Sequence, residues 1–200
     1  VNHPVSASSS LSCGMPVKEF CDLLADAGRG TASNGLSTGF LAIDAFLRGL
    51  RGGTMNTVAG RPGTGKSALA ANIAMSVAKS GGKVLVFSAE MKTAEYIARL
   101  VAIESGEDVQ GYLSNGWMDS AEPIADAVKL CHKLPIGIVD STTIHTSAMR
   151  SYARKVAKTK LDLVIVDYLQ LYRPPGKSYS RENEVSQVSR AMKLLAMECD

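Results

Sequence analysis

The stretch Gly60-Arg61-Pro62-Gly63-Thr64-Gly65-Lys66-Ser67 decides the fold, because it matches the pattern G-x-x-x-x-G-K-[ST] at every fixed position. An apolar run at Thr54 to Ala59 precedes it, and a helical pattern over Ser67 to Lys79 follows. Glycines let such a loop curl so that backbone N–H groups point inward, and the helix N-terminus adds partial positive charge. This arrangement binds phosphate, so we predict a nucleoside triphosphate site here.

Two side chains of the loop have predicted chemical roles. Lys66 is expected to contact the β- and γ-phosphates, and Ser67 to give its hydroxyl to Mg²⁺, which needs only one or two protein ligands. The other residues of the loop are expected to bind phosphate too: Gly60, Arg61, Pro62, Gly63, Thr64 and Gly65. The chain has no N-K-x-D-type segment favouring guanine, so ATP is the expected nucleotide. A glycine-rich turn without ligand is the alternative.

The alternation of apolar runs and helical stripes predicts the fold class. Strand-length runs occur at Val84 to Ser88, Ile136 to Val139 and Leu163 to Val166. Nearly continuous apolar runs are typical of parallel strands that are buried on both faces. With helical stripes between them, they predict an α/β P-loop NTPase with a doubly wound, mainly parallel sheet in one domain.

Composition excludes several classes of protein. Hydrophobic residues make up 46% of the 200, yet no window approaches the roughly 18 consecutive apolar residues of a membrane span, so we expect a cytoplasmic protein without membrane association. The net charge of +3 does not by itself indicate a nucleic-acid binder. The four cysteines form no C-x-x-C pair and are expected to be reduced, half-buried thiols: Cys13, Cys21, Cys131 and Cys199.

Two carboxylates are expected to complete the site, because each follows an apolar run. Asp167 ends the run Leu163 to Val166, which would bring it to the carboxyl edge of the sheet as a second-shell ligand of Mg²⁺. Glu90 follows Val84 to Ser88 and would orient and deprotonate the attacking water. The alternatives are a turn residue for Asp167 and a helix N-terminal carboxylate for Glu90.

Several segments together resemble the hexameric replicative DNA helicases of the DnaB type. The similarity runs from about Gly35 to the end of the chain. Two of these segments, DYLQL at 167–171 and RENEV at 181–185 with SR at 189–190, identify this family more specifically than the phosphate loop does. The segments are Gly35 to Phe40 with Asp44 and Gly53, then Gly60 to Ser67, Phe87 to Met91, Asp167 to Leu171, and Arg181 to Val185 with Ser189 and Arg190. Ala89 departs from the family, whose members usually carry Leu there.

This resemblance implies a RecA-like ATPase core over residues 35–200, with residues 1–34 as a flexible lead-in and linker helix. It implies a ring of six subunits with ATP at each interface, translocating on single-stranded DNA and parting a duplex, with a primase or helicase loader as a further partner. The linker helix around Val17 to Leu24 would dock on a neighbouring subunit. A RecA-like recombinase or repair ATPase, and a nucleotide-gated assembly module, remain alternatives.

A basic segment after DYLQL is the candidate contact with DNA. Residues 173–184 are rich in Pro, Gly and Ser, which predicts a loop, and they carry Arg173, Lys177 and Arg181. In the helicase interpretation the loop faces the central channel, where these cations hold phosphates of a single strand. Tyr179 could stack on a base. The alternative is a solvated loop without a specific partner.

The resemblance also predicts an incomplete sheet at the C-terminal end. In the family, the segment expected after Asp200 carries a γ-phosphate sensor, an arginine finger and a second DNA loop. That segment also contains a strand, which enters the sheet between the strand of Thr54 to Ala59 and the strand of Leu163 to Val166. We therefore expect these two segments not to pair. We also expect the 200 residues alone to bind nucleotide poorly and to hydrolyse it negligibly.

Overall fold

Three parallel strands form a sheet in the computed structural model, with β1 (Val84–Ser88) in the centre between β2 (Ile136–Asp140) and β3 (Leu163–Asp167). The structure describes residues 35–115, 121–140, 145–158, 160–167 and 181–199. All five residues of β1 are buried, as expected for a central strand covered on both faces. The three predicted apolar runs are confirmed as strands.

The register of the sheet aligns the ends of its strands. Ser88 lies opposite Asp140 on one side and opposite Asp167 on the other. Parallel strands end at the same edge, so these three polar residues form a row at the carboxyl edge of the sheet. Ligands of open α/β sheets bind at this edge.

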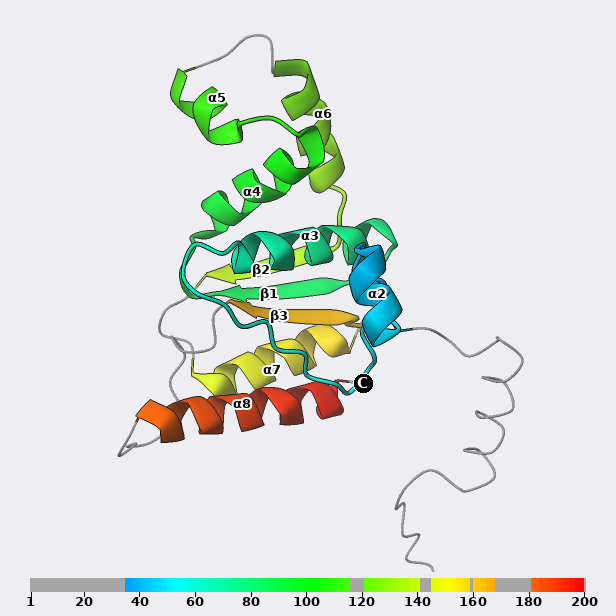
Figure 1. The fold of residues 1–200 in the computed structure, drawn as a ribbon, viewed down its shortest axis with the longest axis vertical. Coiled ribbons are helices and arrows are strands. Elements are labelled where there is room, and N and C mark those ends of the chain that lie inside the picture. The colour runs from blue at the N-terminus through cyan, green and yellow to red at the C-terminus, as the bar shows by residue number, and fades with distance from the viewer. Residues whose placement is uncertain (1–34, 116–120, 141–144, 159, 168–180, 200) are drawn as a thin grey trace, which may run out of the picture. The chain divides into compact units, whose positions relative to one another are not determined.

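Helices cover both faces of the sheet, as Figure 1 shows: α3 (Lys66–Lys79) on one face, and α7 (Thr146–Ala157) with α8 (Arg181–Glu198) on the other. Successive residues of β1 point to opposite faces. Val84 and Val86 therefore pack in a cluster with α3, while Leu85 and Phe87 pack with α7 and α8. The predicted doubly wound α/β fold is confirmed.

Three further helices follow β1, and they stack beyond α3 in Figure 1. They are α4 (Thr93–Ser105), α5 (Val109–Asn115) and α6 (Ala121–Cys131). A separate apolar cluster joins them through Val101, Val109, Ile124 and Ala127. None of the helices in the described ranges is long and apolar enough to cross a membrane.

Residues before the phosphate loop form a closed turn and helix α2 (Leu41–Leu47). Asp44 accepts hydrogen bonds from the hydroxyl of Ser37 at 2.6 Å and from the backbone and hydroxyl of Thr38 at 2.8 and 2.7 Å. The Ser37 hydroxyl, followed by Thr38, holds the pKa of Asp44 below its usual value. Asp44 thus holds the turn before α2 in place, and Thr38 in that turn is fully buried. This turn carries part of the family resemblance.

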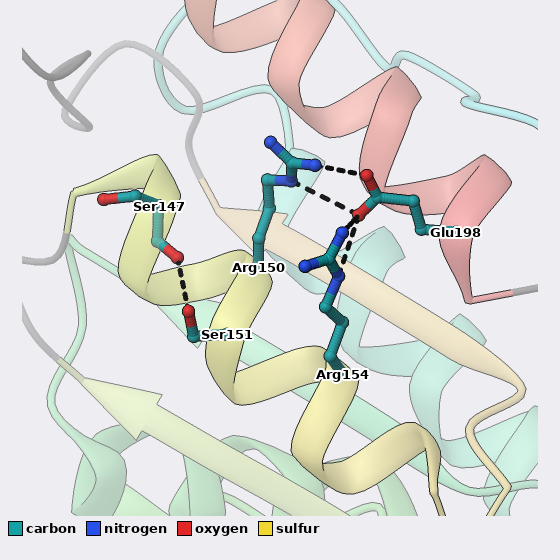
Figure 2. Close-up of polar contacts among 5 residues, drawn as sticks. All are labelled: Ser147, Arg150, Ser151, Arg154 and Glu198. Atoms are coloured by element: carbon teal, nitrogen blue, oxygen red, sulfur yellow. Dashed lines mark hydrogen bonds and ion pairs between the residues drawn. The ribbon is translucent and has the colours of Figure 1, made fainter.

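A double ion pair joins the two helices on the α7 and α8 face. Figure 2 shows Arg150 and Arg154 of α7 reaching the same carboxylate, Glu198 of α8. The Arg154 guanidinium lies 2.9 Å from Oε2 of Glu198, and Arg150 Nε donates to the same oxygen at 3.3 Å. Hydrogen bonding from Arg150, followed by the charges of both arginines, holds the pKa of Glu198 below its usual value.

The prediction of a strand at Thr54 to Ala59 is wrong. These residues lie in no helix or strand, and Val58 is 56% exposed. A strand exists only through hydrogen bonds to a neighbour, and in the described structure β3 forms the edge of the sheet without pairing with this segment. The expectation that Thr54 to Ala59 and Leu163 to Val166 would not pair is confirmed. At the start of the segment, Lys193 Nζ of α8 donates to the carbonyl of Gly53 at 2.7 Å.

The predicted loop over residues 173–184 is also partly wrong, because α8 begins at Arg181. Ser180 followed by the acidic residues Glu182 and Glu184 is a helix-start pattern, since carboxylates in the first turn interact favourably with the helix dipole. The clustered Pro, Gly and Ser residues obscured this signal in the sequence.

Candidate nucleotide-binding site

The predicted phosphate loop is an exposed turn that leads into the N-terminus of α3. Gly63 and Gly65 adopt the left-handed conformation, with φ of 78° and 88°, which side chains with a Cβ rarely adopt. Gly65 is the N-cap of α3, and its carbonyl accepts the first helical hydrogen bond, from Leu69 N at 2.9 Å. No acidic residue lies in the first turn of the helix, so no carboxylate in that turn repels an anion.

Lys66 folds back over the loop. Its Nζ donates to the carbonyl oxygens of Gly60 at 3.0 Å and Arg61 at 2.9 Å, and the Thr64 hydroxyl donates to the carbonyl of Arg61 at 2.8 Å. A Cβ on Gly60 would lie only 2.8 Å from the Thr64 hydroxyl, so the curl of the loop depends on glycine there. The loop thus holds an ammonium group over a turn whose exposed backbone can receive phosphate.

Asp167 lies where the sequence predicts it, as the last residue of β3 at the carboxyl edge. Its side chain belongs to a residue only 8% exposed, and Oδ2 has no hydrogen-bond partner among the described residues. A buried carboxylate oxygen without a partner is costly unless a cation or water satisfies it. Helix α3, which carries Ser67 in its first turn, packs against β3. The donor set of a hydroxyl and a carboxylate fits Mg²⁺.

Glu90 lies in a tight turn between β1 and α4, and its side chain is exposed. The Ser88 hydroxyl closes this turn, since it accepts from Met91 N at 3.1 Å and donates to the Met91 carbonyl at 2.8 Å. The turn is therefore fixed at its base while the Glu90 carboxylate remains accessible to water.

Asp140, the last residue of β2, is a further carboxylate at the same edge of the sheet, and the sequence-based predictions did not include it. Its Oδ2 accepts a 2.6 Å hydrogen bond from the backbone N–H of Thr93, the first residue of α4. This N–H, followed by the Thr93 hydroxyl, holds the pKa of Asp140 below its usual value. The signal was present, because Asp140 follows an apolar run just as Asp167 does.

The predicted DNA contacts cannot be placed. Arg173, Lys177 and Tyr179 lie outside the described residues, and of Arg181 only the backbone position at the start of α8 is described. Their role remains a prediction from the sequence. His132 and His145 are both exposed.

Comparison with known proteins gives one consistent family. Residues 35–200 match the family model described as the DnaB-like helicase C terminal domain. The replicative DNA helicase DnaB of Nostoc sp. is 35% identical over 176 residues, covering 85% of this chain and 20% of the relative. DnaB of Pasteurella multocida is 36% identical over 172 residues, covering 83% of this chain and 37% of the relative.

Solved structures show the same fold. A DnaB-like replicative helicase, studied with its interactions with primase, superposes with a TM-score of 0.83 at 24% identity, covering 94% of this chain and 47% of that one. A second structure, described as an ATPase domain, gives a TM-score of 0.85 at 24% identity over 94% of this chain and 69% of that one. The chain thus spans between about a fifth and two fifths of the length of these curated relatives.

Proposed function

The chain belongs to the DnaB-like helicase C-terminal domain family, and from this premise we propose that it is the motor domain of a replicative DNA helicase. In this proposal, ATP hydrolysis drives movement along single-stranded DNA and separates the strands of a duplex. The observation that carries it is the phosphate loop beside a sheet edge at which Asp167 keeps a buried oxygen without a partner among the described residues.

In this proposal the phosphate loop binds the phosphates of the nucleotide, and the carboxyl edge of the sheet helps to hold Mg²⁺. Lys66 exchanges its contacts with the carbonyls of Gly60 and Arg61 for the β- and γ-phosphates, and the backbone of Gly60 to Ser67 surrounds the phosphate oxygens. Ser67 and Asp167 would hold Mg²⁺, Ser67 directly and Asp167 through its water. When bound, Mg²⁺ supplies positive charge against the triphosphate.

Glu90 performs the proton transfer in this proposal. Its carboxylate accepts a proton from the attacking water while the water oxygen bonds to the γ-phosphorus and the bond to the ADP oxygen breaks. The Ser88 hydroxyl closes the turn that carries Glu90, and the Asp140 carboxylate holds the start of the helix that follows, so the backbone around the base is held in place. Positioning of this kind is the main contribution that a protein makes to phosphoryl transfer.

The contacts with DNA and with other subunits extend the same proposal. Arg173, Lys177 and Arg181 would hold phosphates of a single strand in the channel of a six-membered ring. Residues 35–200 would form the ATPase core, and residues 1–34 the tether with the linker helix. Primase is the partner that the work on a structural relative suggests.

Single-stranded DNA should stimulate ATP hydrolysis by the full-length protein, and this stimulation tests the proposal. A motor that moves along DNA couples the two, so phosphate release should rise when an unstructured oligonucleotide is added. The matched control is Lys66→Ala, which should release little phosphate with or without DNA. ATP binding with no effect of DNA on turnover would instead identify an assembly module gated by nucleotide.

A further inference from the structure

Tyr96, in the first turn of α4, carries a buried hydroxyl that the site as described above does not use. The residue is fully buried, and its ring packs in the cluster that contains Val86 of β1 and Leu100 of α4. Its hydroxyl has no hydrogen-bond partner in the described parts of the chain. Buried tyrosine hydroxyls usually find a partner, because leaving one unpaired costs free energy.

The second buried polar atom without a partner among the described residues is Oδ2 of Asp167. Ile165 of β3 packs against the cluster that contains Tyr96, and Asp167, two residues further along the strand, points to the same face of the sheet. Burial raises the pKa of Tyr96 to about 12, and the negative charge of Asp167 is the next contribution to that rise. The hydroxyl therefore stays protonated and remains a donor at neutral pH. A donor and a carboxylate acceptor, both buried and both without partners in the described residues, are chemically complementary.

We propose that Tyr96 is a positioning residue for the metal site, whose hydroxyl donates a hydrogen bond to the Asp167 carboxylate through one buried water. This inference rests on the proposed role of Asp167 toward Mg²⁺. The two atoms form no direct hydrogen bond with each other, and a water between polar groups satisfies both of them. The carboxylate then has one fixed orientation and keeps its other lone pairs for the hydration shell of Mg²⁺.

The position of Tyr96 gives this contact a second consequence. Tyr96 N donates to the carbonyl of Lys92 at 3.0 Å, so the residue belongs to the same helix start that Asp140 fixes just after Glu90. The water-mediated contact of Tyr96 with Asp167 therefore connects the segment of the proposed base to the proposed metal-binding carboxylate. Both parts of the site are then held in one arrangement.

Calorimetric titration of the full-length protein with a nonhydrolysable ATP analogue, with and without Mg²⁺, tests the inference. Tyr96→Phe keeps the ring and removes only the hydroxyl. The gain in affinity that Mg²⁺ brings should fall about tenfold, the lower end for a lost hydrogen bond to a charged group. Affinity without Mg²⁺ should stay at the wild-type value, which a merely structural role would not predict.

Two further variants separate the inference from the proposed function. Tyr112→Phe is the matched control, because Tyr112 of α5 is a partly buried tyrosine in the separate cluster of α4, α5 and α6, and it should keep the full Mg²⁺ gain. Asp167→Asn should lose most of it. Suppose that Asp167→Asn abolishes the Mg²⁺ gain, but Tyr96→Phe keeps that gain or loses affinity equally with and without Mg²⁺. The role of Tyr96 is then overturned, while the proposed role of Asp167 at the metal site is supported. If Asp167→Asn also keeps the gain, both are overturned.

Discussion

Asp140 at the end of β2 accepts a 2.6 Å hydrogen bond from the backbone N–H of Thr93 at the start of α4, and so joins the end of β2 to the helix that follows Glu90. A helix N-terminus has N–H groups without intrahelical partners, and a carboxylate there satisfies one of them. The position of the proposed base thus depends on a residue that contacts neither nucleotide nor water in the proposed mechanism.

Replacing Asp140 with Ala should lower turnover of ATP by about tenfold, because a loosened helix start lets the Glu90 turn move away from its reacting geometry. ATP affinity should change little. Steady-state kinetics of the full-length protein measure both, and Asp126→Ala, which removes an exposed carboxylate on α6, is the control. The hydrogen bond depresses the pKa of Asp140, so its contribution to stability is present above the ordinary value of 3.8 and is lost as pH falls below it. Unchanged turnover in the Ala variant would contradict this role.

Replacing Lys66 with Ala should weaken ATP binding by at least about tenfold, the scale of a hydrogen bond between charged groups. The fold should survive, since the ammonium contacts only two carbonyls of its own loop. Calorimetric titration gives the affinity and circular dichroism gives the melting temperature. Lys129→Ala, on the exposed face of α6, is the matched control, and equal affinity in the two variants would exclude Lys66 from the site.

Glu90→Gln should separate binding from chemistry, because the amide keeps the size of the carboxylate but cannot accept a proton from water. Turnover should fall at least about a hundredfold, in the range of a positioned general base, while ATP affinity stays. Glu122→Gln provides the comparison, since Glu122 is another exposed glutamate at the start of a helix. Nearly normal turnover in Glu90→Gln would mean that Glu90 only interacts with the N-terminus of α4.

The double variant Lys177→Ala and Arg181→Ala tests the segment that precedes and begins α8. Affinity for single-stranded DNA should fall, and the slope of log affinity against log salt should flatten by about 0.7 for each lost phosphate contact. Lys129→Ala with Lys133→Ala removes the same charge from α6 and the turn after it, and should leave the slope unchanged. The same slope in both double variants would place the DNA elsewhere.

The strands were predictable because the central sheet is buried on both faces, and continuous apolar runs such as Val84 to Ser88 have few other interpretations. Asp167 was predictable for the same reason, since its place follows from the end of its strand. The conformation of Thr54 to Ala59 was not predictable, because an extended segment becomes a strand only when a neighbouring strand pairs with it. A local sequence pattern does not contain that information.

Tyr96 could not have been assigned from sequence. A tyrosine at an apolar position of a helical stripe predicts core packing, and that prediction holds for its ring. Its proposed water-mediated contact with Asp167 depends on how α4 packs against the sheet, which brings together residues far apart in the chain. Asp140 is an intermediate case, because its place at a strand end was visible but its partner, Thr93, was not.

Strand displacement from a forked duplex by the full-length protein tests whether this chain is the motor of a helicase. With ATP and Mg²⁺, the wild-type protein should release the displaced strand, and Lys66→Ala should release none. If the protein instead binds ATP and single-stranded DNA, forms ATP-dependent filaments and releases no strand from the fork, it is an ATPase of the recombinase type and not a helicase motor.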